Sequence, residues 1–222
     1  MSKLRTVQQL QDSLDEGFAW RLKEVADLKV STKLNTSLAQ ATLLRAGVPL
    51  LYAHWEGFIK QSSQDYLTFV ANQRLSYGQL SSCFIVFGAK KHLANLVSSR
   101  RADVNIAAVE FFRTCLVDRA DLALSGVVDT ERNLKANVFA NIAVSVGVAT
   151  DPYEPYFKLI DESLVARRNK IAHGEHLDLD ANDFRLLADN VINLLRMYKT
   201  NLENLASTEA FRAKTLPKLP GA

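Results

Sequence analysis

Apolar residues recur every three to four positions along most of this chain, and the residues that would interrupt such a pattern are scarce. Its 222 residues include nine glycines and five prolines, and no Asn-Gly or Asp-Gly pair joins two alternating runs. A period near 3.6 residues places apolar side chains on one face of an α-helix. The sequence therefore predicts an all-α fold, an up-and-down bundle of long helices with shorter additional helices.

The periodic segments predict seven helical stretches. They cover about residues 2–29, 33–74, 77–98, 104–124, 134–148, 154–173 and 180–205. Pro49 lies inside the second stretch. We expect it to bend or break that helix, because proline lacks a backbone donor and clashes with the preceding turn.

Capping residues mark the ends of the last three helices. Asn133 is placed to cap a helix that starts at Leu134, and Gly147 suits a left-handed stop at its end. Gly174 is placed to end the next helix, and Asp180 can cap the last one. We expect residues 1–222 to form a single α-helical domain. Its N-terminal helix covers about 2–29, its core about 35–205, and a frayed tail 206–222.

Charge and cysteine content narrow the function classes only slightly. The net charge of +3 permits binding to nucleic acid without demanding it. Cys83 and Cys115 lie in apolar runs without a CxxC spacing, which predicts buried reduced thiols in a cytoplasmic protein. No apolar run approaches the ~20 residues of a membrane span, and the polar first residues do not resemble a signal peptide. We therefore expect no membrane association.

The stretch "LVARRNKIAHGEH", residues 164–176, combines a helical pattern with a cluster of basic side chains. At ~100° per residue, Phe157, Ile160, Leu164 and Ile171 form one buried stripe, and Arg168 lies only ~40° from Leu164. A guanidinium so close to an apolar face is either paired at a seam or extends out of it toward water.

Three further polar residues share one face of this helix. Asn169 and His173 are four positions apart, and Glu162 lies seven before Asn169. Arg168 and His173 diverge by ~140°, so one straight helix does not aim them at one point. A second helix is needed, from the same chain or from a two-fold mate. Alternatively, the segment is a basic last turn that interacts favourably with the helix dipole, and Gly174 is its cap. The position of Arg168 next to the apolar stripe is the feature that this alternative explains least well.

The residues "RRNKIAHG" resemble the motif of the HEPN superfamily, in which an Arg and a polar residue precede a His on the last core helix. The matching residues are Arg168, Asn169 and His173. The segments 50–67 and 132–148 also resemble helices of stand-alone bacterial HEPN proteins found in defence and toxin–antitoxin settings, and the resemblance covers about 35–205.

The resemblance implies a metal-independent endoribonuclease without cofactor that dimerises through the 160–176 helix. His173 then exchanges protons during attack of a ribose 2′-hydroxyl on the adjacent phosphodiester, Arg168 stabilises the phosphate charge, and Asn169 orients His173 or the phosphate. The expected partners are RNA and an antitoxin or defence-system protein. Some family members carry a Tyr two positions after the His, where this chain has Glu175. Others are binding scaffolds for RNA, nucleotides or proteins without catalysis.

The remaining candidates are weaker. Glu56, Glu162 and His54 form a second tier of catalytic candidates, although Glu56 equally suits a structural pair. Arg167, Lys170 and His176 are candidate RNA contacts beside the motif. Three further sites are interpreted either as solvated surface or as contacts to a phosphate backbone: His92, Lys90–Lys91 and residues 98–103. No metal site is expected, because Gly174 separates His173 from His176 and no HExxH is present.

Overall fold

The computed structural model describes residues 4–34, 37–122, 124 and 126–214. Its α-helices are α1 (Val7–Leu34), α2 (Ser37–Asn72), α3 (Ser82–Ser98), α4 (Ala102–Thr114), α5 (Ala136–Ser145), α6 (Ala166–Ala172) and α7 (Ala181–Ser207). Three short 3-10 helices, η1 (Tyr77–Gln79), η2 (Cys115–Val117) and η3 (Asp151–Tyr156), and one π-helix, η4 (Leu159–Val165), complete them. Strands are absent from the described residues apart from two isolated bridges. The all-α prediction is confirmed.

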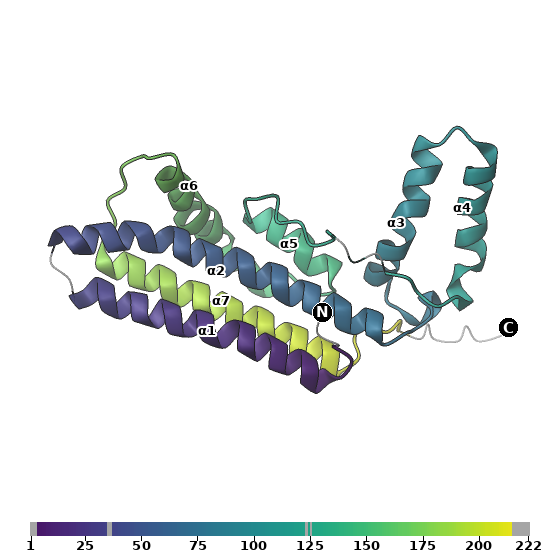
Figure 1. Cartoon of the computed structure of the whole chain (residues 1–222), viewed down its shortest axis with the longest axis horizontal. Coiled ribbons are helices and arrows are strands. Elements are labelled where there is room, and N and C mark those ends of the chain that lie inside the picture. The colour runs from purple at the N-terminus through teal and green to yellow at the C-terminus, as the bar shows by residue number, and fades with distance from the viewer. Residues whose placement is uncertain (1–3, 35–36, 123, 125, 215–222) are drawn as a thin grey trace.

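Three long helices, α1, α2 and α7, lie side by side and form the main bundle (Figure 1). The sequence of α7 explains why it joins them, since Val191, Leu194, Leu195, Tyr198 and Leu202 recur at helical spacing and are all buried. The Tyr198 hydroxyl needs a partner in this core, and it lies 2.7 Å from the Ser63 hydroxyl of α2. One cluster of buried hydrophobic residues extends from the first described residues to Phe211.

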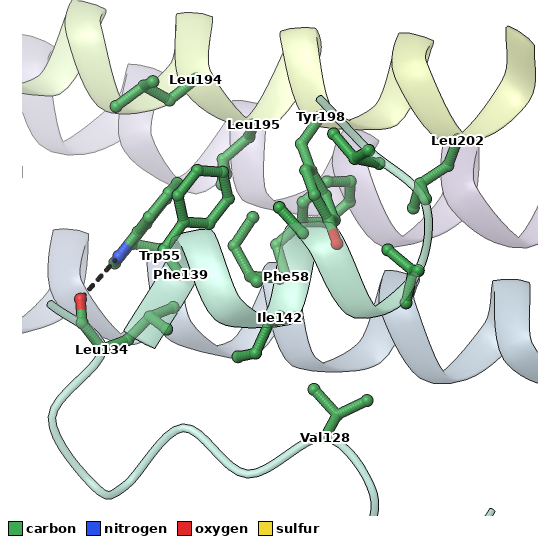
Figure 2. Packing of buried hydrophobic residues seen from close by; sticks show 14 of the residues in the cluster. Trp55, Phe58, Val128, Leu134, Phe139, Ile142, Leu194, Leu195, Tyr198 and Leu202 are labelled. Atoms are coloured by element: carbon green, nitrogen blue, oxygen red, sulfur yellow. Dashed lines mark hydrogen bonds between the residues drawn. The ribbon is translucent and has the colours of Figure 1, made fainter. Parts of the chain in front are cut away.

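A second layer, made of α5, η4 and α6, packs against α2 (Figure 1). Trp55 of α2 is its anchor: the indole is fully buried and lies 5.0 Å from the Phe139 ring of α5, measured between centroids. Its Nε1–H donates to the Leu134 carbonyl at 3.1 Å, as Figure 2 shows. The apolar body of one side chain thus fills the core while its polar edge holds the loop that precedes α5.

Helices α3 and α4 form a hairpin that stands away from the bundle (Figure 1). Its base is held by Tyr77, whose ring packs edge-on against Phe111 and whose hydroxyl donates to the Asp121 carbonyl at 3.1 Å. Gly88 makes this packing possible, because a Cβ there would lie 2.2 Å from the Tyr77 hydroxyl oxygen.

Several predicted helix boundaries are wrong. Helix α2 continues through Pro49, so the predicted stretch 33–74 is one helix and, of the bend or break expected at Pro49, the break is absent. The predicted 104–124 helix ends at Thr114 and continues only as a short 3-10 turn, and the predicted 77–98 helix begins as a 3-10 turn. Asn133 does not cap α5, which starts at Ala136 and has Lys135 at its cap position.

Other expectations about the ends hold. Gly147 and Gly174 both have the left-handed conformation of a helix stop, with φ of +82° and +77°. Asp180 caps α7 by accepting from the Asn182 amide. The tail differs from the expectation up to residue 213, because Phe211 is buried and the Ala213 amide donates to Gln79, and residues 215–222 lie outside the described part. No described helix is long and apolar enough to cross a membrane. The single-domain division stays a prediction.

Candidate functional site

The motif helix begins as a π-helix, η4, and continues as the seven-residue α6. A π-helix has more residues per turn than an α-helix, so neighbouring residues can both face the core. Leu164 and Val165 are both fully buried, whereas the α-helical wheel predicted only Leu164. Segments of this kind occur frequently at functional sites. Here it shifts the register immediately before Arg168.

Arg168 is paired at a seam between α6, α2 and the loop before α5. Its guanidinium carbon lies 4.0 Å from the centroid of the Tyr52 ring. Its Nη1 donates to Asn169 Oδ1 at 2.7 Å and its Nη2 to the Arg132 carbonyl at 3.1 Å. Stacking on an aromatic face and two directed hydrogen bonds hold the charged fork in one orientation. Of the two alternatives left open by the sequence, pairing is therefore the observed one.

Tyr52 is itself fixed from the other side. It is 3% exposed, and its hydroxyl accepts a hydrogen bond from the Leu134 amide at 2.8 Å. Burial raises the pKa of the Tyr52 hydroxyl, the Leu134 amide and the Arg168 charge lower it, and the Glu56 carboxylate raises it. The phenol therefore stays neutral at physiological pH and offers Arg168 an uncharged aromatic face.

The loop before α5 is tied down along its length. Thr130 donates to Glu56 Oε1 at 2.5 Å, and the Ala136 amide at the start of α5 donates to Asp161 Oδ1 of η4 at 2.8 Å. Asp161 thus supplies the cap that Lys135 cannot provide. The Arg132 carbonyl, which accepts the hydrogen bond from Arg168, is consequently part of a loop whose position is fixed.

Asn169 and His173 complete the motif in different ways. The Asn169 amide oxygen accepts a hydrogen bond from Arg168, so this side chain helps to orient the arginine. His173 follows the last turn of α6, and its amide donates to the Asn169 carbonyl at 3.0 Å. The His173 side chain is exposed. A fixed guanidinium can bind a phosphate, and an exposed imidazole can exchange a proton with a bound substrate.

The comparison with known families agrees with this geometry. A family model described as RiboL-PSP-HEPN matches residues 16–204. The chain belongs to the RiboL-PSP-HEPN family. The match spans most of α1, all of α2 and most of α7 as well as the motif helix, so it includes Tyr52, Arg132 and Asn169, which hold Arg168. Neither the curated proteins nor the solved structures contain a significant match.

Of the second-tier residues of this HEPN chain, only Glu56 lies in the surroundings of Arg168. Glu56 lies one helical turn from Tyr52 and contributes to its environment, so it belongs to the surroundings of Arg168. His54 faces α1 instead, with its Nε2 2.8 Å from Glu24 Oε2. Glu162 is exposed and pairs with Lys158 at 3.9 Å. Neither His54 nor Glu162 is in contact with Arg168.

The candidate RNA contacts beside the HEPN motif differ in their surroundings. Lys170 is exposed. Arg167 is half-buried in a shallow pocket beside Asp183 and Leu187 of α7. His176 is exposed and lies 2.9 Å from Asp178. In the part of the chain that the structure describes, no group of three or more His, Cys, Asp and Glu side chains could hold a metal ion.

Sequence reasoning missed the residues that hold Arg168. Tyr52 was assigned no role, although it precedes Glu56 by four positions in "LYAHWEGF" and therefore shares its helix face. That spacing was an available signal. The Arg132 carbonyl had no signal, because a backbone oxygen is the same in every residue and only the path of the loop directs it to the guanidinium.

Proposed function

We propose that this chain is a metal-independent HEPN endoribonuclease that cleaves RNA by attack of a ribose 2′-hydroxyl. The observation that carries the proposal is the fixed guanidinium of Arg168 on the short helix that ends at the exposed His173, in a chain of the HEPN family. An arginine has five donors, and only two are engaged among the described residues. The others remain for phosphate oxygens.

Each residue has one task in the proposed reaction. His173 takes the proton of the 2′-hydroxyl, and that oxygen forms a bond to the adjacent phosphorus. The bond from phosphorus to the 5′-oxygen breaks, and a second, protonated imidazole supplies the proton of the leaving alcohol. Arg168 stabilises the negative charge on the non-bridging oxygens. The products are a 2′,3′-cyclic phosphate and a free 5′-hydroxyl.

The second imidazole comes from a second copy of the chain. Each chain carries one motif histidine, and Arg168 and His173 diverge by ~140° along α6. We therefore propose a homodimer through the 160–176 segment, in which two motif helices share one cleft. We place the protein in the cytoplasm, acting on single-stranded or loop RNA in phage defence or as a toxin held by a protein antitoxin.

The test is cleavage by purified protein in the presence of a chelator. Total RNA should acquire 2′,3′-cyclic phosphate ends, and His173→Ala should remove this activity. Lys158→Ala, a change at an exposed residue of the same segment that is not among the candidate contacts, is the control and should retain it. A folded wild-type protein that produces no cyclic ends at any concentration would show that the proposal is wrong.

The alternative function is binding of RNA, a nucleotide or a protein without cleavage. It is favoured by the engagement of both Nη atoms of Arg168 within the chain. Expression in a host separates the two. A nuclease slows growth and His173→Ala relieves the effect, whereas for a binding module wild type and His173→Ala are equally harmless and bind RNA equally well.

A further inference from the structure

A hollow lies at the base of the α3–α4 hairpin, beside the segment that follows η2. Its volume is about 520 Å³, within the range of sites that bind small molecules. Five charged side chains line it: Lys90 and Lys91 of α3, and Asp118, Arg119 and Asp121 of the segment after η2. Among the described residues, none of the five forms an ion pair or a side-chain hydrogen bond. Their charges are therefore available to a ligand.

The segment 118–121 forms one wall of this hollow, and Tyr77 holds its backbone in place. The Tyr77 amide donates to the Asp118 carbonyl at 3.0 Å. The Tyr77 hydroxyl donates to the Asp121 carbonyl and accepts from the Asp121 amide at 3.2 Å. The backbone on both sides of Arg119 is thus fixed without a ligand, so binding does not have to order this wall.

Helix α3 forms another wall, and Lys91 lies at its centre. On the helical wheel Lys91 lies between Phe87 and Gly88, and all three line the hollow. The next positions on either side, Lys90 and His92, are each rotated by about 100° from Lys91. Lys90 also lines a smaller neighbouring hollow of about 140 Å³ that contains two carboxylates of the loop before α5. Lys91 is therefore the lysine of α3 that serves the larger hollow alone.

Aromatic side chains line the hollow beside Lys91. The His92 imidazole stacks on the Phe111 ring of α4, with centroids 3.8 Å apart and planes 3° from parallel. The Tyr77 ring packs edge-on against Phe111. His92 and Phe111 are both only half-buried. An aromatic surface that is open on one side can stack on a flat base.

We propose that this hollow binds a nucleotide. Its lining carries both signs of charge, so a simple anion would leave Asp118 and Asp121 without a partner. A nucleotide satisfies both signs, because Lys91 and Arg119 bind its phosphate oxygens while the two carboxylates accept hydrogen bonds from its ribose hydroxyls or base amino groups. Its base stacks on the aromatic wall. A free nucleotide and one residue of an RNA strand share this chemistry.

This site is separate from the motif helix. Figure 1 shows α6 and the hairpin at different parts of the molecule. The proposal does not rest on the proposed function, because the hollow can bind a nucleotide whether or not the chain cleaves RNA.

The test is calorimetric titration of full-length His173→Ala protein, in which bound RNA stays intact. The ligands are ATP, GTP, CTP, UTP, a trinucleotide of RNA, and tripolyphosphate. Lys91→Ala and Arg119→Ala, both at exposed positions, should each raise the dissociation constant of the nucleotide about tenfold, because each removes a charge-assisted hydrogen bond. Lys60→Ala, at an exposed lysine of α2 outside the lining of the hollow, is the matched control and should bind like its parent.

The set of ligands separates the source of the nucleotide from simple anion binding. Binding of a nucleoside triphosphate supports a free nucleotide, and binding of the trinucleotide alone supports an RNA strand. Tripolyphosphate lacks ribose and base and should bind about tenfold more weakly than ATP. Equal binding of the two would reduce the hollow to an anion site and overturn the proposal. It is also wrong if no nucleotide binds, or if Lys91→Ala and Arg119→Ala both bind as tightly as their parent.

Discussion

At the residue scale, the position of Arg168 is decided by groups far away in the sequence. Its guanidinium is held by an aromatic ring 116 positions earlier and by a carbonyl 36 positions earlier. The guanidinium stacks on the Tyr52 ring, and its hydrogen bond to the Arg132 carbonyl fixes its orientation. The motif can therefore be intact in the sequence and still depend on side chains outside it.

The Tyr52 ring, rather than its hydroxyl, should matter for catalysis. Tyr52→Phe removes the hydrogen bond to the Leu134 amide and should cost about 1 kcal/mol of stability while leaving cleavage within a few-fold of wild type. Tyr52→Leu removes the face under Arg168 and should lower the cleavage rate about tenfold. Denaturant unfolding and RNA cleavage measured on both variants separate the effects. Equal losses of cleavage in the two variants would contradict a positioning role for the ring.

His54 should make the folded state sensitive to mild acid. The side chain is 2% exposed, and burial lowers its pKa, although the Glu24 carboxylate and its contact partly oppose this shift. The unfolded chain then binds the proton more readily, so stability is lost as the pH falls through the unfolded value of about 6.5. His54→Leu should lose less stability between pH 7.5 and 5.5 than wild type, measured by urea unfolding. His176→Gln, at an exposed histidine, should follow wild type.

At the element scale, the sequence predicted which segments are helical but not where several of them end. The spacing of apolar residues is set by burial against the core and does not depend on how a helix begins or ends. The sequence therefore predicts the long helices. The unbroken passage of α2 through Pro49 was not predictable, because the contacts of α1 and α7 on either side outweigh one lost hydrogen bond. The π-helix before Arg168 was also hidden, since a wheel drawn at a constant angle cannot show a change of register.

Two glycines of α2 should respond differently to alanine. A Cβ on Gly47 would lie 2.6 Å from the Phe184 ring of α7, and overpacking of this kind costs about 1–3 kcal/mol. The gain in helix propensity is about 1 kcal/mol and does not offset it. A Cβ on Gly57 would meet only the end of the Arg21 side chain at 3.3 Å. Thermal unfolding should therefore show Gly47→Ala destabilised and Gly57→Ala neutral or stabilised; the reverse order would contradict the packing argument.

At the scale of the whole molecule, the proposed active site belongs to two chains. Arg168→Ala should keep the fold and lose most turnover, and so should His173→Ala. Mixing the two proteins under conditions of subunit exchange should recover a small part of the activity, because the shared cleft of the mixed dimer holds one Arg168 and one His173, and water then protonates the leaving alcohol in place of the second imidazole. Mixed dimers, verified by mass, that stay as inactive as the single variants would exclude this shared arrangement. Activity of a monomer at nanomolar concentration would exclude it as well.

The loop before α5 has a consequence for amide exchange with solvent. Leu134 lies outside regular secondary structure, yet its amide donates to Tyr52. Its carbonyl accepts from Trp55, as Figure 2 shows. Backbone amides in loops usually exchange their hydrogen with solvent quickly, because loops open at a low cost in free energy. This one can exchange only when Tyr52 releases it, so deuterium should enter Leu134 about as slowly as it enters the middle of α2. The rate of that single amide then reports how often the support beneath Arg168 opens.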